Sequence, residues 1–142
     1  MNKFIKYILI FFLTLNATTM NAQNQKDKSI PTSGMLVRIS EIEIIPKYLE
    51  AYNAILKEEA AASMKVEPGV IAIFPMYVKE NPNQIRIVEI YTNKEAYLSH
   101  LETPHFKYYK TETLKMVKSL KLLDMTSIDP EGMKLIFSKM EE

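Results

Sequence analysis

Four short segments of the chain have the hydrophobic pattern of β-strands, three with apolar and polar residues mixed on their faces and one, 70–79, that is almost wholly β-branched, aromatic and apolar, as in a buried strand. These segments are 35–45 (MLVRISEIEII), 70–79 (VIAIFPMYVK), 85–91 (IRIVEIY) and 119–128 (SLKLLDMTSI). The second and third segments are separated by residues 81–83 (NPN), whose composition is typical of a tight turn. We therefore expect these two strands to pair in an antiparallel manner.

Helical patterns lie between and after these strands. Residues 47–66 carry apolar side chains at helical spacing among Ala and Glu, which are strong helix formers. A second helix is expected over residues 94–101. Thr103 and Pro104 then supply an N-cap and a first helical residue, so another helix begins there. Residues 132–139 predict a short terminal helix whose place in the fold the pattern does not give.

The order strand–helix–strand–strand–helix–strand predicts the fold class. Two right-handed βαβ units in this order form an α+β, ferredoxin-like βαββαβ sandwich, in which helices cover one face of the sheet. The other face also carries Ile, Leu and Tyr. Because an exposed apolar sheet face is unfavourable in water, we expect a second copy of the chain to pack against it, forming a homodimer.

The first residues of the chain have the composition of a targeting segment. Lys3 and Lys6 precede a nearly unbroken apolar run over 7–15, and small and polar residues follow as far as Ala22. A basic start, an apolar core of about 7–15 residues and a small residue before the cut describe a secretory signal peptide. A membrane anchor is the alternative, but this run is shorter than the roughly 20 apolar residues that a spanning helix needs.

Cleavage after Ala22 would divide the chain into parts of different character. We expect a signal peptide (1–22), a flexible linker (23–34), a folded domain (35–128) and a C-terminal extension (129–142). The mature protein is then expected to be secreted or periplasmic, with no stable association with a membrane after the signal is removed.

Composition excludes several classes of function. The 142 residues include 18 basic and 17 acidic side chains, giving a formal net charge of +1. This balance provides no positive surface for nucleic acid, so no nucleic-acid partner is expected. The absence of Cys excludes disulfides, thiolate metal ligands and a Cys nucleophile. With three Gly in the chain, a glycine-rich phosphate loop is not expected either.

The two histidines, His100 and His105, are the first candidates for chemistry. On one continuous helix their imidazoles would point about 140° apart. The break at Thr103 and Pro104 changes this geometry and allows both to face one cavity. The alternative for each is a half-buried histidine that packs and makes one hydrogen bond. A metal site is not expected, because no third ligand stands at a recognisable spacing from the pair.

Glu89 is an ionisable residue in the middle of an apolar strand, which is costly unless the carboxylate has a partner. Arg38 on the first strand is a candidate for that partner. By alternation, Glu89 shares a strand face with Tyr91 and lies on the opposite face from Arg86. One interpretation places Glu89, Tyr91 and a histidine around a pocket, and the other is a buried ion pair or an exposed sheet edge.

Three segments together resemble the antibiotic biosynthesis monooxygenase family, and in particular its small quinol monooxygenases. The segments are 38–46 (RISEIEIIP), 67–77 (EPGVIAIFPMY) and 89–110 (EIYTNKEAYLSHLETPHFKYYK). The similarity covers residues 35–128. It implies a ferredoxin-like, dimeric α+β barrel with a cavity in each protomer between the sheet and the helices.

The resemblance also implies an activity, the oxidation of a quinol or another electron-rich aromatic by O₂ without a cofactor. Because the substrate supplies the electrons, the protein has to ionise a phenol and hold it in a dry pocket. On this interpretation His100 is the first candidate for the base and His105 the second. The tyrosines would position the ring, and an arginine would stabilise anionic charge. The residues expected to contact the substrate are Tyr91, Tyr109, Glu89, Arg38 and Arg86.

A second function fits the same residues. An exported, non-enzymatic dimeric module that binds a small apolar or aromatic ligand needs the same cavity as a monooxygenase. The sequence leaves these two functions open.

Overall fold

The computed structural model of the protein describes residues 34–140. The predicted signal peptide (1–22) and all but the last residue of the predicted linker (23–34) lie outside the described residues. The elements in chain order are β1 (Leu36–Ile44), a 3₁₀ turn (Pro46–Tyr48), α1 (Leu49–Val66), β2 (Val70–Val78), β3 (Asn81–Tyr91), α2 (Lys94–Leu101), α3 (Pro104–Thr113), a second 3₁₀ turn (Leu114–Met116), β4 (Val117–Met125) and α4 (Gly132–Ser138).

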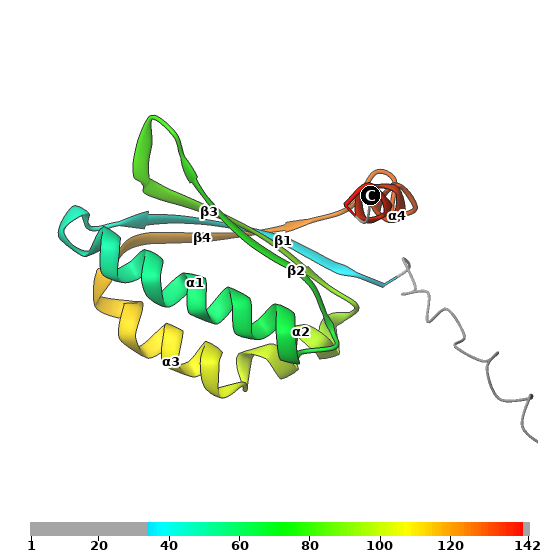
Figure 1. Ribbon diagram of the computed structural model, residues 1–142, viewed down its shortest axis with the longest axis horizontal. Coiled ribbons are helices and arrows are strands. Elements are labelled where there is room, and N and C mark those ends of the chain that lie inside the picture. The colour runs from blue at the N-terminus through cyan, green and yellow to red at the C-terminus, as the bar shows by residue number, and fades with distance from the viewer. Residues whose placement is uncertain (1–33, 141–142) are drawn as a thin grey trace, which may run out of the picture. The chain divides into compact units, whose positions relative to one another are not determined.

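The four strands form one antiparallel sheet in the order β2-β3-β1-β4. Figure 1 shows α1, α2 and α3 together on one side of this sheet. The predicted α+β, ferredoxin-like class is therefore confirmed. Strand β2, which contains Pro75, is an edge strand, as expected for a residue that lacks a backbone donor.

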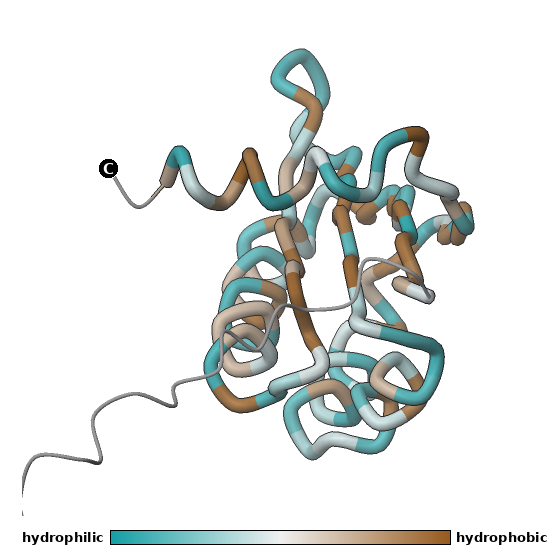
Figure 2. The backbone as a smooth tube through the Cα atoms, turned by 90° about the vertical axis from the view of Figure 1, so that its right-hand side faces the viewer, coloured by the Kyte–Doolittle hydropathy of each residue, from teal (hydrophilic) through white to brown (hydrophobic). Residues whose placement is uncertain are grey.

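The alternating pattern of the strands gives the sheet two different faces. Figure 2 shows hydrophobic and hydrophilic residues following one another along the chain. On β1, Ile42 and Ile44 point towards the helices and are buried, and Ile85 and Ile87 do the same on β3. The helix-facing side therefore carries the main apolar core, onto which α1 packs.

Helix α1 contributes a buried stripe at three- and four-residue spacing. Tyr52, Leu56 and Ala60 are apolar members of this stripe, as the sequence predicted. The same stripe also contains Glu59 and Ser63, which are 5% and 0% exposed. Two polar side chains are thus placed inside the domain by a helix that is otherwise an ordinary core helix.

Several local boundaries differ from the prediction, and strand β4 ends at Met125, before the expected 128. The turn between β2 and β3 lies at Lys79 and Glu80, because Val78 already pairs with Asn81 and closes the hairpin over two residues. Residues 81–83 consequently belong to β3 and do not form the turn. Strand β4 begins at Val117, earlier than expected, since that residue continues the pairing with β1.

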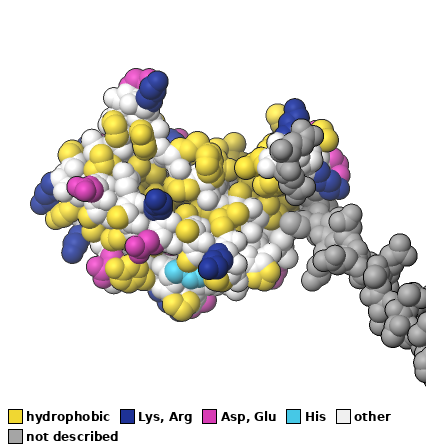
Figure 3. All heavy atoms as spheres, viewed as in Figure 1, with side chains coloured by type: hydrophobic (Ala, Val, Ile, Leu, Met, Phe, Trp, Pro, Cys, Tyr) yellow, Lys and Arg dark blue, Asp and Glu magenta, His cyan; other side chains and the backbone are white. Residues whose placement is uncertain are grey.

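The sheet face opposite the helices remains partly uncovered. Phe74 on β2 and Met125 on β4 are 61% and 45% exposed on this face, beside the half-buried Val37 and Val88. Helix α4 also exposes apolar side chains, and Figure 3 shows hydrophobic atoms at the surface around this end of the chain. Within residues 34–140, none of the helices combines the length and the apolar character needed to cross a bilayer.

Candidate functional site

A cavity of about 460 Å³ lies between the helix-facing side of the sheet and the helices. Leu56, Ile73, Ile87 and Phe106 contribute to its apolar wall. Four of the site residues expected from the sequence reach this wall, and they are Arg38, Glu89, His100 and Tyr109. The three others, His105, Tyr91 and Arg86, are not among the residues that line it.

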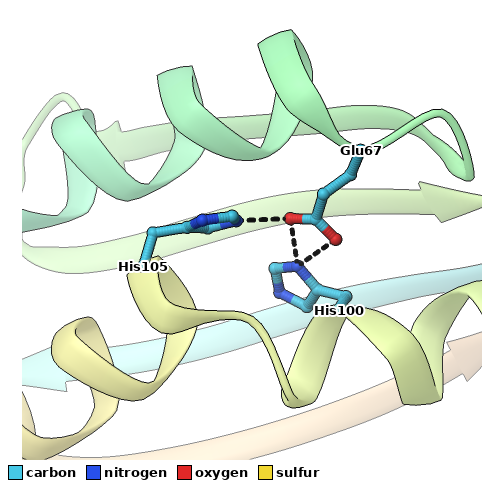
Figure 4. Close-up of side chains that lie close together, drawn as sticks. All are labelled: Glu67, His100 and His105. Atoms are coloured by element: carbon cyan, nitrogen blue, oxygen red, sulfur yellow. Dashed lines mark hydrogen bonds and ion pairs between the residues drawn. The ribbon is translucent and has the colours of Figure 1, made fainter.

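His100 is placed in the wall by α2. Asn93 caps this helix by accepting a hydrogen bond from the backbone N–H of Ala96 at 2.8 Å, and Tyr97, His100 and Leu101 then share the face towards the cavity. The whole residue is 3% exposed. Nδ1 of His100 lies 3.0 Å from Oε1 of Glu67, as Figure 4 shows, and this contact fixes the ring.

Glu67 is the site residue that sequence reasoning missed. It follows the last residue of α1, where Gly69 allows the chain to pass directly over α2, since a Cβ at this position would lie 2.5 Å from the Cβ of Ala96. Burial alone raises the pKa of Glu67, but hydrogen bonds to His105 and His100 outweigh it and leave that pKa below its ordinary value. In the sequence, Glu67 stood out only as the first residue of the EPGV segment.

His105 lies on the other side of the same carboxylate. Thr103 caps α3 and Pro104 follows it, so the predicted break is present. Nε2 of His105 is 2.6 Å from Oε1 of Glu67, and the side chain is 19% exposed (Figure 4). The break therefore brings both imidazoles to one carboxylate, whereas the expectation that both face one cavity holds for His100 alone.

Glu59 is a second acidic group that the sequence analysis did not single out. Its carboxylate accepts a hydrogen bond from Ser63 at 2.9 Å, and its Oε1 lies 3.6 Å from Nε2 of His100. Burial raises the pKa of Glu59 above its ordinary value, although the Ser63 hydrogen bond and His100 act in the opposite direction. Its spacing from Tyr52 and Leu56 was the available signal, because these positions repeat on one helix face.

The hydrogen-bond partners of Glu89 lie on the same face of the sheet as Glu89 itself. Its carboxylate accepts hydrogen bonds from the hydroxyls of Ser40 and Tyr91. Tyr91 is fully buried behind the wall, where its ring packs against Tyr97 and His100, so it supports the cavity and does not line it. Burial and the neighbouring Glu89 raise the pKa of the Tyr91 hydroxyl, which stays protonated.

Arg38 lies directly opposite Glu89 in the pairing of β1 with β3, yet its guanidinium binds elsewhere. Its Nη2 is 2.6 Å from Oδ1 of Asp124 on β4, and its charge lies 4.5 Å from the centre of the Tyr97 ring. The expected Arg38–Glu89 ion pair is therefore wrong. Both residues still line the cavity.

The remaining two candidates differ in position. Tyr109 lines the cavity, and its hydroxyl is 2.7 Å from that of Tyr52. Burial is the main reason that the pKa of Tyr109 rises to about 12. Arg86 instead points to the opposite sheet face, where it contacts Glu41 at 3.6 Å, so it cannot act on a ligand in this cavity.

The comparisons with known proteins agree with this architecture. A family model described as "Antibiotic biosynthesis monooxygenase" matches residues 35–112. A crystal structure named "Putative antibiotic biosynthesis monooxygenase" from Bacteroides thetaiotaomicron is 49% identical, with a TM-score of 0.70, and the match covers 70% of this chain and 95% of that one. No protein among the curated ones matches the chain.

More distant structures share the fold. A "putative monooxygenase" from Lactobacillus acidophilus is 33% identical with a TM-score of 0.64, over 66% of this chain and 44% of that chain. A protein from Nitrosomonas europaea is 18% identical with a TM-score of 0.64, over 68% of this chain and 92% of that chain. The match of the family model to more than half of the chain, together with the 49% identical structure, shows that the protein belongs to the antibiotic biosynthesis monooxygenase family.

Proposed function

We propose that this protein is a monooxygenase that oxidises a quinol or another electron-rich aromatic with O₂. The family membership supports a monooxygenase-like protein, and the cavity supports an aromatic substrate. The wall combines apolar side chains such as Leu56 and Phe106 with a few ionisable ones, which is the usual composition of a site for a small organic ligand.

One observation carries the proposal, namely the buried imidazole of His100 in the cavity wall. When Nδ1–H of His100 donates to the Glu67 carboxylate, the other ring nitrogen, Nε2, is left as a proton acceptor. A carboxylate that orients a histidine and stabilises its protonated form is the arrangement that makes a histidine an effective base. We infer that His100 removes a phenolic proton from the substrate.

The proposed reaction balances without a bound redox cofactor, because the substrate supplies the electrons. The ionised quinol passes one electron to O₂, and the resulting radicals combine to form a carbon–oxygen bond and a hydroperoxide. Loss of one water molecule then leaves a hydroxylated quinone, so one oxygen atom enters the product and the other leaves as water. A site without bulk water favours steps of this kind, so the proposal expects the bound substrate to displace water from the apolar wall.

The other cavity residues have supporting roles in this proposal. The guanidinium of Arg38 is held by Asp124 and provides positive charge for the ionised substrate. The hydroxyl of Tyr109 provides a hydrogen-bonding group beside the ring. We assign no substrate contact to Tyr91 or Arg86, because neither lines the cavity.

The test is oxygen uptake by the purified protein with a panel of hydroquinones. We expect His100→Gln to lower the rate by a factor of about 100 or more, the range in which general-base catalysis falls. His105→Gln should lower it less, because that ring lies outside the cavity. Glu102→Gln, at an exposed carboxylate between α2 and α3, should have no effect.

Two results would contradict the proposal. Uptake that is the same in the parent and in His100→Gln would exclude His100 as the base. Tight binding of an aromatic ligand with no oxygen uptake by any quinol would instead favour the exported, non-enzymatic binding module.

Proposals on the assembly of the protein and its location in the cell follow from two further features of the chain. We propose a homodimer in which two sheets pack through the face that carries Phe74 and Met125, because this face is apolar and uncovered. We propose that residues 1–22 direct the protein to the periplasm or the exterior. Fractionation of cells, with mass measurement of the mature chain, tests this second point.

A further inference from the structure

The most unusual cluster in the described residues consists of Glu67, His100 and His105. One oxygen of the carboxylate and one nitrogen of each imidazole all lie within 4.8 Å of one another. The three side chains come from the end of α1, from α2 and from α3, and Figure 4 shows both imidazoles directed at the Glu67 carboxylate. We propose that Glu67, His100 and His105 bind one divalent first-row transition-metal ion, with Zn²⁺ as the representative.

The ligand atoms are close enough together to bind such an ion after small movements of the rings. Atoms that bind a metal at about 2.0–2.2 Å lie about 3.0–3.5 Å from one another. The Oε1–Nδ1 distance between Glu67 and His100 is 3.0 Å, and the Oε1–Nε2 distance to His105 is 2.6 Å. A small outward movement of the His105 ring would bring the second distance into the same range.

The types of ligand select the class of metal. Two imidazoles and one carboxylate suit zinc, cobalt, nickel, copper or ferrous iron, whereas calcium and magnesium prefer an all-oxygen set. Three protein ligands leave a further position for water or another small ligand.

An independent feature is the carboxylate behind His100. Metal-bound histidines almost always donate their other ring N–H to a carboxylate, a carbonyl or water. Nε2 of His100 faces Oε1 of Glu59 at 3.6 Å, and Glu59 is itself held by Ser63. At 3.6 Å the contact is longer than a hydrogen bond, and a small shift of the ring would let this buried carboxylate accept from a metal-bound imidazole.

The charge around the cluster and its access to solvent also support a bound metal ion. Two acidic side chains adjoin the imidazole of His100, with side-chain exposures of 5% for Glu59 and 10% for Glu67, and such an acidic, buried surrounding favours a cation. His105 is 19% exposed, and Figure 3 shows histidine atoms at the surface on this side of the molecule. The cluster can therefore be reached by an ion from solvent through His105.

Metal binding would have a consequence for the function proposed above. A metal on Nδ1 fixes the proton of His100 on Nε2, and this nitrogen can then no longer accept a proton from a substrate. The metal-loaded protein would be the less active form. The binding site itself does not depend on the proposed function, because its test needs no substrate.

The test is a titration of protein without a histidine tag, stripped with a chelator, with ZnCl₂ and CoCl₂ in a calorimeter. We expect one ion per chain, visible absorption of the Co²⁺ form and a raised melting temperature with Zn²⁺. Glu67→Gln and His105→Gln should each weaken binding by at least about a hundredfold. Glu59→Gln should weaken it by about ten- to a hundredfold, as carboxylates behind ligands do.

A matched control and a clear negative result complete the experiment. Glu102→Gln removes an exposed carboxylate near the site that is not a ligand, so binding should be unchanged. His105 is near the surface, and melting of His105→Gln checks that this variant is folded. Less than one equivalent bound, or parent-like affinity in both His105→Gln and Glu67→Gln, would overturn the metal site.

Discussion

Glu59 and Glu67 lie on two sides of the His100 imidazole, and the pKa values of their carboxyl groups are displaced in opposite directions. Glu59 is buried with one hydrogen bond, from Ser63, so the cost of burying its charge dominates and raises its pKa. Glu67 is also buried, but it bonds to two imidazoles, which favour the ionised form. One histidine is thus placed between an acid that resists ionisation and one that retains its charge.

The raised pKa of Glu59 predicts a specific dependence of stability on pH. Between the unfolded pKa of about 4.3 and the higher folded pKa, the folded state binds more protons, so this group lowers stability as pH rises. Glu59→Gln has no titratable carboxyl group at this position, so this loss of stability with rising pH is absent from the variant. We expect its free energy of unfolding, relative to that of the parent, to increase as pH rises above about 4.3. Urea unfolding at a series of pH values measures this, and a flat difference would contradict it.

The lowered pKa of Glu67 predicts the opposite sign. Its ionised form stabilises the fold above the unfolded pKa, and this stability is lost as pH falls through the lower folded pKa. Glu67→Gln should therefore cost about 1–3 kcal/mol at neutral pH, as expected for hydrogen bonds to a charged group. The cost should shrink on acidification below about 4.3. The same urea series serves as the measurement, and a cost that grows on acidification would refute the assignment.

The close approach of Gly69 to Ala96 predicts coupling between the two positions. Gly69→Ala puts a methyl group 2.5 Å from the Cβ of Ala96, which should destabilise the protein by about 1–3 kcal/mol. Ala96→Gly alone should cost about 0.5–1 kcal/mol, as Gly does within a helix. The double variant should lose less stability than the sum of the losses in the two single variants, and the difference should be about 0.5–3 kcal/mol. Additive losses in thermal or urea unfolding would show that the contact is not the cause.

The uncovered sheet face predicts the effect of a charge on assembly. Phe74→Glu puts a carboxylate into the proposed dimer interface, so this variant should be monomeric at low micromolar concentrations at which the parent is dimeric. Tyr77→Glu is the matched control, because Tyr77 is on the same strand and similarly exposed, at 60%, but points to the other face. Size-exclusion chromatography with light scattering gives the masses. A monomeric parent, or a Tyr77→Glu variant that alone dissociates, would exclude this interface.

The sequence by itself determined the order and type of the elements. Alternation over residues 35–45 and helical spacing over 47–66 are local signals, and each survives because burial of one face reinforces it. The helix break at Thr103 and Pro104 was equally predictable from the sequence, because the N-cap of Thr103 and the fixed φ of Pro104 both act within one helical turn. The turn was displaced because strand pairing extended to Asn81 and overrode the preference of the NPN segment for a turn.

Only the tertiary structure decided which polar groups meet. Glu67 and His100 are 33 positions apart and contact each other because α1 ends over α2, a relationship of packed elements that no spacing reveals. The partner of Arg38 was likewise decided by geometry, since Asp124 and Glu89 lie opposite it on two neighbouring strands. Periodicity assigns a residue to a face of its element, whereas the contacts of its charged atoms depend on which elements pack together.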